Sequence, residues 1–227
     1  MADIQHAAAL NRGQFDRLIK VTRATSRYAL RDVLILMIGH RAKFRVTETS
    51  RITVADVMFQ SGKLREEVSL RQVVTKNSKQ RCAYFSNKDL IAALEAYIAY
   101  RLDKGIGTEL DDSKGYRGLL PDMPLIWSSR GGGMSQNTKR RTLESGEQRD
   151  YKASDSTQAH LTRLYRNAGI RGGSSHSGRR TFAQRVLEKT GDIQVVATLL
   201  GHDSIDCTDR YLDVKQDVLC EMFANAI

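Results

Sequence analysis

The sequence predicts an α+β fold that is mostly helical and carries a small antiparallel sheet. Helical patterns cover residues 13–40, 89–102 and most of 157–226, whereas residues 68–85 have the strand–turn–strand pattern of a β-hairpin. Neither an internal repeat nor a convincing linker divides the chain, and 41% apolar residues suffice for a core. We therefore expect residues 1–227 to form a single domain.

The first three helices are expected near the N-terminus. Apolar side chains repeat at helical spacing over residues 13–23 and 26–40, and Asn11 and Ser26 are the candidate N-caps of these two helices. A short third helix is expected over residues 46–50.

The middle of the chain changes from strands to helix and then to loop. Two strands are predicted over residues 68–74 and 81–85, with a polar turn at 75–79 between them. A helix over 89–102 follows, and residues 124–127 suggest a short strand. The remaining helices are expected over residues 157–167, 177–189, 192–201, from Ser204 or Asp206 past Tyr211, and 214–226.

The chain is strongly basic. Its formal net charge is +10 and its isoelectric point is near 9.7. Such a charge favours a polyanionic partner, because phosphates that are neutralised by basic side chains release their counterions. A basic surface that only keeps the protein soluble is the alternative.

The cellular compartment is predicted from the cysteines and the apolar runs. Cys82, Cys207 and Cys220 lack CxxC spacing, so we expect neither a disulfide framework nor a zinc site, and a reducing cytosol fits best. The N-terminus lacks a signal-peptide pattern, and the apolar run at 33–38 is too short to span a bilayer. A cytoplasmic, nucleoid-associated protein without a membrane role is expected.

Four polar residues near the C-terminus suit phosphoryl transfer. His176 and Arg179 are three positions apart at a helix start, His202 follows Leu200-Gly201, and Tyr211 comes nine positions later. A tyrosine hydroxyl can attack a phosphate if fixed guanidinium and imidazole groups neutralise the transition state. Each residue alone is more often structural, so the prediction depends on their joint occurrence.

These motifs resemble the tyrosine recombinases, also called the phage integrase family. His176-x-x-Arg179, Leu-Gly-His at 200–202 and Tyr211 match the second box of that family. Upstream, the segment containing Arg45 and Glu48 resembles its first box, and residues 75–81 resemble the hairpin that supplies its lysine. The resemblance runs from about Leu10 to the C-terminus.

The resemblance implies how a DNA phosphate would be bound and attacked. Tyr211 would be the nucleophile and would form a 3′-phosphotyrosyl bond. Arg45 and Arg179 would bind the non-bridging oxygens, since guanidinium groups match phosphate and stay charged. His202 would donate a hydrogen bond to the same phosphate.

The remaining catalytic roles concern protons and orientation. Lys76 would protonate the leaving 5′-oxygen as general acid, with Lys79 as the second candidate, and His176 would assist proton transfer at the tyrosine. Glu48 would orient the arginines. Religation then needs neither ATP nor a metal ion, and no cofactor is expected.

Double-stranded DNA is the expected partner, bound by a homo-oligomer that is a tetramer on paired sites, with possible helper DNA-binding proteins. Residues 139–156 are basic and poor in apolar residues, and a solvated loop is their default interpretation. The alternative is a mobile segment that contacts DNA. The candidate DNA-binding residues are Lys79, Arg81, Lys139, Arg140, Arg141 and Arg180.

The chain also departs from the family pattern. Gly178 stands where an apolar residue is common, and Arg180 stands where a second histidine is common. The N-terminal DNA-clamping domain of the family is not expected, so residues 1–227 would be a catalytic domain alone, similar in size to the short fimbrial phase-variation recombinases.

Three other functions are alternatives to recombination. A DNA-binding protein of the same fold could recombine weakly or only with a partner. A type IB topoisomerase is less favoured, because lysine would then be expected where His176 stands. A metal-dependent nuclease is disfavoured because the sequence has no carboxylate cluster and no His/Cys ligand spacing.

Overall fold

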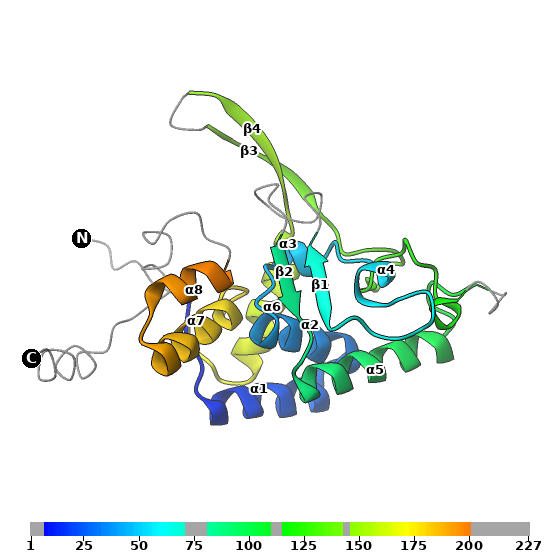
Figure 1. Cartoon of the computed structure of the whole chain (residues 1–227), viewed down its shortest axis with the longest axis horizontal. Helices are drawn as coiled ribbons and strands as arrows, with labels where there is room; N and C mark the ends of the chain where they lie inside the picture. The colour runs from blue at the N-terminus through cyan, green and yellow to red at the C-terminus, as the bar shows by residue number, and fades with distance from the viewer. Residues whose placement is uncertain (1–6, 71–80, 110–114, 143–145, 201–227) are drawn as a thin grey trace, which may run out of the picture.

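The computed structural model describes residues 7–70, 81–109, 115–142 and 146–200 and confirms a mostly helical α+β fold. Within these ranges the strands form two antiparallel pairs, β1–β2 and β3–β4 (Figure 1). The helices are α1 (Arg12–Thr25), α2 (Ala29–Arg41), α3 (Val46–Thr49), α4 (Val54–Val57), α5 (Lys88–Asp103), the 3-10 helix η2 (Tyr116–Gly118), α6 (Asp155–Asn167), α7 (Ser177–Thr190) and α8 (Ile193–Leu200). The strands are β1 (Glu67–Leu70), β2 (Arg81–Tyr84), β3 (Asn137–Thr142) and β4 (Gln148–Ala153).

Helix α2 is the centre of the core. Six consecutive residues, 33–38, are all buried, as expected for a helix that is covered on every side. Helices α1, α5 and α7 pack against it. Helix α8 is held by α7 through a smaller apolar cluster that contains Ala183, Val196 and Leu200. The position of α7 therefore depends on α2, and the position of α8 depends on α7.

The N-terminal helices match the predicted ranges, but one predicted cap is wrong. Asn11 caps α1 in a capping box, because its side chain accepts from the Gln14 amide at 2.9 Å while Gln14 accepts from the Asn11 amide at 3.0 Å. Ser26 does not cap α2, which begins after Tyr28. The Ser26 hydroxyl instead donates to the buried carboxylate of Asp32, at 2.5 Å.

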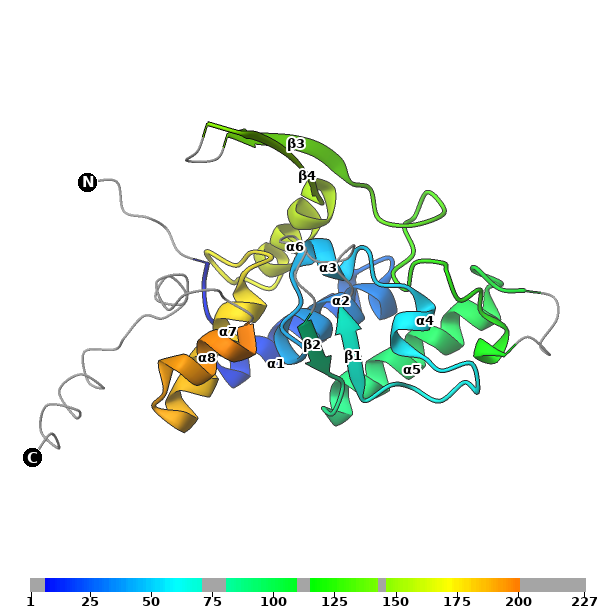
Figure 2. The same cartoon turned by 45° about the horizontal axis from the view of Figure 1, so that its top comes forward.

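The predicted hairpin is present in the part that the structure describes. Strands β1 and β2 pair antiparallel from Glu67 opposite Tyr84 to Leu70 opposite Arg81, and they lie beside α3 in Figures 1 and 2. The predicted turn at 75–79 falls outside the described residues. The predicted strand at 124–127 is wrong, because this segment forms only isolated bridges, such as the one between Thr53 and Pro124.

Residues 137–142 and 148–153 form a second pair of antiparallel strands, where a solvated loop is the default prediction for residues 139–156. Strands β3 and β4 pair from Asn137 opposite Ala153 to Thr142 opposite Gln148, and they project away from the helices (Figures 1 and 2). Both faces are largely exposed, so the sequence lacks the apolar alternation by which strands are recognised. Backbone pairing and the cross-strand ion pair between Arg140 and Asp150 hold the described part of the hairpin instead.

A buried histidine links α2 to α6. His40 is 6% exposed, and its Nε2 lies 2.8 Å from the hydroxyl of Tyr165. Burial, together with the charges of Arg185 and Arg41, lowers the pKa of His40 to about 3. The imidazole is therefore neutral in the folded protein throughout the neutral and mildly acidic range.

Acid is expected to destabilise the protein through His40. Below pH 6.5 the unfolded state gains a proton that folded His40 does not bind until about pH 3, so the free energy of unfolding falls as the pH falls. The expected loss from this one group is about 2 kcal/mol between pH 7 and pH 5. Urea unfolding of wild type and His40→Gln across this pH range should show a larger fall in the free energy of unfolding for the wild type. Equal losses would contradict the prediction.

Candidate active site

The candidate active site begins with a close contact between two helices. Helix α7 starts at Ser177, so Gly178 lies in its first turn. A Cβ atom on Gly178 would lie 2.6 Å from the carbonyl carbon of Gly39 and 2.9 Å from the backbone nitrogen of His40. Only glycine permits this approach of backbone to backbone. The contact explains why this chain has glycine where the family pattern has an apolar residue.

Arg179, the next residue, is fixed by two backbone carbonyl groups. Its side chain is buried, with the whole residue 1% exposed. Nη1 donates to the carbonyl oxygen of Lys43 at 2.6 Å, and Nη2 donates to that of Leu200 at 2.8 Å. Arg179 thereby joins the segment before Arg45 to the end of α8. Two predicted catalytic segments that are far apart in sequence are thus connected directly.

Arg45 contacts Glu48, the carboxylate that is predicted to orient the arginines. Arg45 is the N-cap residue of α3, and its Nη1 lies 3.0 Å from Oε1 of Glu48. The other carboxylate oxygen of Glu48 accepts from the Arg45 amide at 2.7 Å. The Glu48 side chain is fully buried, whereas 19% of the Arg45 side chain is exposed. Arg45 thus combines a fixed orientation with access to solvent.

His176 and Arg180 flank Arg179 but differ in exposure. His176 is the N-cap residue of α7 and is exposed, whereas Arg180 is 3% exposed. An exposed imidazole at this helix start could reach a bound substrate. The predicted DNA contact of Arg180 stays a prediction, because the side chain is covered in this structure.

Two of the predicted DNA-binding residues on β3, Lys139 and Arg140, are exposed and paired with carboxylates. Lys139 Nζ lies 2.9 Å from Asp155, and Arg140 Nε lies 2.7 Å from Asp150. The hydrogen bond to Asp155 raises the pKa of Lys139, and the one to Asp150 raises that of Arg140. Both side chains are therefore cationic at neutral pH, on a hairpin that extends from the body of the protein (Figure 1). Arg141 belongs to the same strand.

Part of the predicted site falls outside the described residues. These positions are Lys76, Lys79, His202 and Tyr211. Arg81 is placed by its backbone as the first residue of β2. Within the described ranges, no group of three or more His, Cys, Asp or Glu side chains could hold a metal ion.

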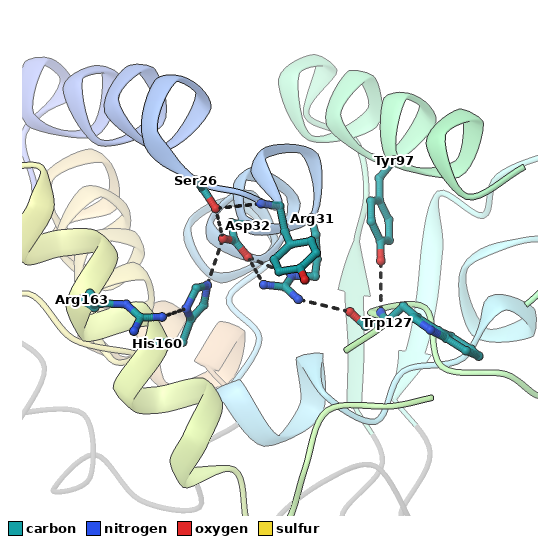
Figure 3. Close-up of polar contacts among 8 residues, drawn as sticks. Ser26, Arg31, Asp32, Tyr97, Trp127, His160 and Arg163 are labelled. Atoms are coloured by element: carbon teal, nitrogen blue, oxygen red, sulfur yellow. Dashed lines mark hydrogen bonds and ion pairs between the residues drawn. The ribbon is translucent and has the colours of Figure 1, made fainter. Parts of the chain in front are cut away.

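A buried polar cluster that the sequence does not predict lies between α2 and α6 (Figure 3). The Asp32 carboxylate is fully buried. It accepts hydrogen bonds from Ser26 and from Arg31, the latter at 2.9 Å, and its Oδ2 lies 2.9 Å from His160 Nε2. His160 Nδ1 accepts from Arg163 at 2.8 Å, so Nε2 must carry the imidazole proton. Asp32 directly precedes the apolar run at 33–38, and this position was the only available signal in the sequence.

The sequence and the fold both match proteins of one known group. Residues 9–217 match the model of the Phage integrase family. The chain belongs to this family. Tyrosine recombinase XerC of Pelobacter propionicus is 26% identical over 213 residues, which are 94% of this chain and 57% of the relative. Tyrosine recombinase XerD of Mycobacterium leprae is 27% identical over 208 residues, 90% of this chain and 55% of the relative. This phage integrase family member thus spans a little over half the length of these relatives.

Solved structures show the same catalytic fold. The crystal structure of XerA recombinase superposes with a TM-score of 0.65 at 21% identity. The match covers all of this chain and 65% of the XerA chain. XerH site-specific recombinase, solved bound to its difH substrate, gives a TM-score of 0.62 at 16% identity. This match covers 96% of this chain and 54% of the XerH chain. None of the described helices of this family member is long and apolar enough to cross a lipid bilayer.

Proposed function

We propose that this protein is a site-specific recombinase that cleaves and rejoins double-stranded DNA through a 3′-phosphotyrosyl intermediate, without a metal ion or ATP. The contact between Arg179 and the Lys43 carbonyl carries the proposal, because it fixes one candidate phosphate-binding arginine beside the segment that bears the other, Arg45. Two guanidinium groups suit the charge that develops on the non-bridging oxygens during transfer. Arg45 is partly exposed for such a contact, whereas Arg179 is covered in this structure. Membership of the phage integrase family supports the same chemistry.

In the proposed reaction, the hydroxyl of Tyr211 attacks the phosphorus and the bond to the 5′-oxygen breaks. The leaving 5′-oxygen takes its proton from Lys76 or Lys79, while His176 assists removal of the tyrosine proton. His202 donates a hydrogen bond to the phosphate. Because the phosphotyrosyl bond retains the energy of the broken phosphodiester, a 5′-hydroxyl from another duplex can attack it and release Tyr211.

The proposed partners follow from the same function. Lambda integrase, which this fold matches with a TM-score of 0.58, has been solved as a dimer bound to a core site, and XerH has been solved on difH. We infer a tetramer on paired DNA sites for this chain, with possible helper proteins, acting in the cytoplasm. The similarity to the short fimbrial phase-variation recombinases stays a prediction.

Covalent capture of DNA is the expected result that tests this function. Wild-type protein is incubated in EDTA with a pool of nicked duplexes that carry randomised arms, and protein-linked DNA is recovered under denaturing conditions and sequenced. Wild type is expected to capture an enriched sequence, whereas Tyr211→Phe, which lacks the nucleophilic oxygen, is expected to capture none. Absence of wild-type adduct would refute the proposed cleavage, and adduct from Tyr211→Phe would refute the assigned nucleophile.

The enriched duplex also separates the two candidate lysines. A 5′-phosphorothiolate at the scissile position supplies a leaving group that needs no proton, so it should restore cleavage to the variant that lacks the general acid. We expect restoration for Lys76→Ala, with Lys79→Ala as the matched control. A two-site recombination assay and a supercoil-relaxation assay then distinguish a recombinase from a topoisomerase.

A further inference from the structure

Helix α2 ends in a backbone conformation that is unusual for its residue. Ala42 is the C-cap of α2, and Lys43 follows with φ +56°, in the left-handed region. Helices often end this way, but usually with glycine, because a Cβ atom in this region costs about 1 kcal/mol. Among the described residues, Tyr116 and Arg117 are the other non-glycine residues with positive φ, and they belong to a separate turn.

The turn at Lys43 meets the candidate active site on two sides. Its carbonyl oxygen accepts from Arg179 Nη1 at 2.6 Å. Its ammonium nitrogen lies 5.6 Å from the centre of the Phe182 ring, which is three residues after Arg179 on α7. The whole residue is 5% exposed, so the lysine is packed into the protein. Both ends of Lys43 thus contact the first turns of α7.

We propose that Lys43 is a positioning residue whose left-handed turn directs its backbone carbonyl to Arg179. Strained backbone persists where the surrounding structure requires it, and here the requirement is an acceptor for a buried guanidinium. The carbonyl oxygens of Lys43 and Leu200 each accept a hydrogen bond from one terminal nitrogen of Arg179. These two contacts fix the plane of the guanidinium. The catalytic consequence rests on the proposed function, whereas the contact itself does not.

Arginine side-chain NMR tests the contact without any DNA. Lys43→Gly keeps the left-handed turn at no steric cost, whereas Lys43→Val opposes it because a β-branched residue is disfavoured there. In protein labelled with ¹⁵N-arginine and assigned with Arg179→Lys, wild type and Lys43→Gly should show slowly exchanging Arg179 Nη protons, and Lys43→Val should lose them. Retention in Lys43→Val, or loss in Lys43→Gly, would overturn the proposal. Thermal unfolding of each variant fixes a temperature at which all are folded.

Cleavage of the enriched duplex tests the consequence. Lys43→Gly is expected to form adduct about tenfold or more faster than Lys43→Val, since small displacements of positioning groups slow catalysis strongly. A methylphosphonate at the scissile position removes the charge that Arg179 would neutralise, so this difference should shrink to roughly threefold or less. An equal difference on both substrates would indicate general disruption and overturn the proposal. If wild type forms no adduct, the proposed function fails, and the NMR comparison still decides whether Lys43 positions Arg179.

Discussion

Gly178→Ala is expected to destabilise the protein by about 2–3 kcal/mol, because overpacking of this size costs 1–3 kcal/mol or more. The new methyl group would lie 2.6 Å from backbone atoms of Gly39, and backbone cannot move aside as a flexible side chain can. Helix α7 would have to separate from α2, and Arg179 would move with it. Urea unfolding measures the loss of stability, and the rate of DNA capture measures the effect of displacing Arg179.

Gly39→Ala is the matched control on the other side of the same contact. A Cβ atom at Gly39 meets no atom within 4 Å, and Gly39 lies inside α2. Replacing a helical glycine by alanine in open space should stabilise the protein by roughly 0.5–1 kcal/mol. Comparable destabilisation by both substitutions would show that close approach of α7 is not the cause.

Asp32→Asn is expected to lower the free energy of unfolding by about 3 kcal/mol, the typical cost of breaking a buried ion pair. The amide would leave Arg31 buried without its carboxylate and could not accept from all three donors as the carboxylate does. Urea unfolding at pH 7 measures the effect. Asp155→Asn, which removes the exposed partner of Lys139, is the control and should change stability much less.

The pH dependence of Asp32 gives a second check on the same cluster. Burial alone would raise the pKa of Asp32, but hydrogen bonds from His160 and Ser26 and the charge of Arg31 hold it below 3.8. A lowered pKa means that the stabilisation is complete above about pH 5 and is lost as the pH falls through the folded-state value. The difference between wild type and Asp32→Asn should therefore shrink only in acid.

The helices were predictable because their signals are local. Asn11 and the apolar spacing of α1 are read within one or two turns of chain, and both are confirmed. Ser26 carried the same capping signal, but the buried Asp32 carboxylate competes for its hydroxyl. The β3–β4 hairpin was missed because its strands are joined by backbone hydrogen bonds and the Arg140–Asp150 ion pair, which leave no apolar pattern in the sequence.

Among the contacts of the candidate site, those between residues close in sequence could be predicted and those between distant residues could not. The orientation of Arg45 by Glu48 follows from a spacing of three residues. The contact of Arg179 with Lys43 spans 136 residues and uses a backbone carbonyl, which any residue type could supply. Nothing in the sequence marks a lysine as the residue that takes a left-handed turn. Contacts of this kind depend on tertiary packing and need coordinates.

The carboxylates on and beside the β3–β4 hairpin change what its basic charge can do. Asp150 already forms an ion pair with Arg140, and Asp155 forms one with Lys139. A DNA phosphate would therefore have to displace a carboxylate from each of these cations. Such binding is an exchange of anions, and it releases fewer counterions than an unpaired cation would. The proposed affinity of this hairpin for DNA would then respond less steeply to salt than its number of basic residues suggests. The same exchange also disfavours non-specific binding of polyanions that make only weak contacts with the hairpin.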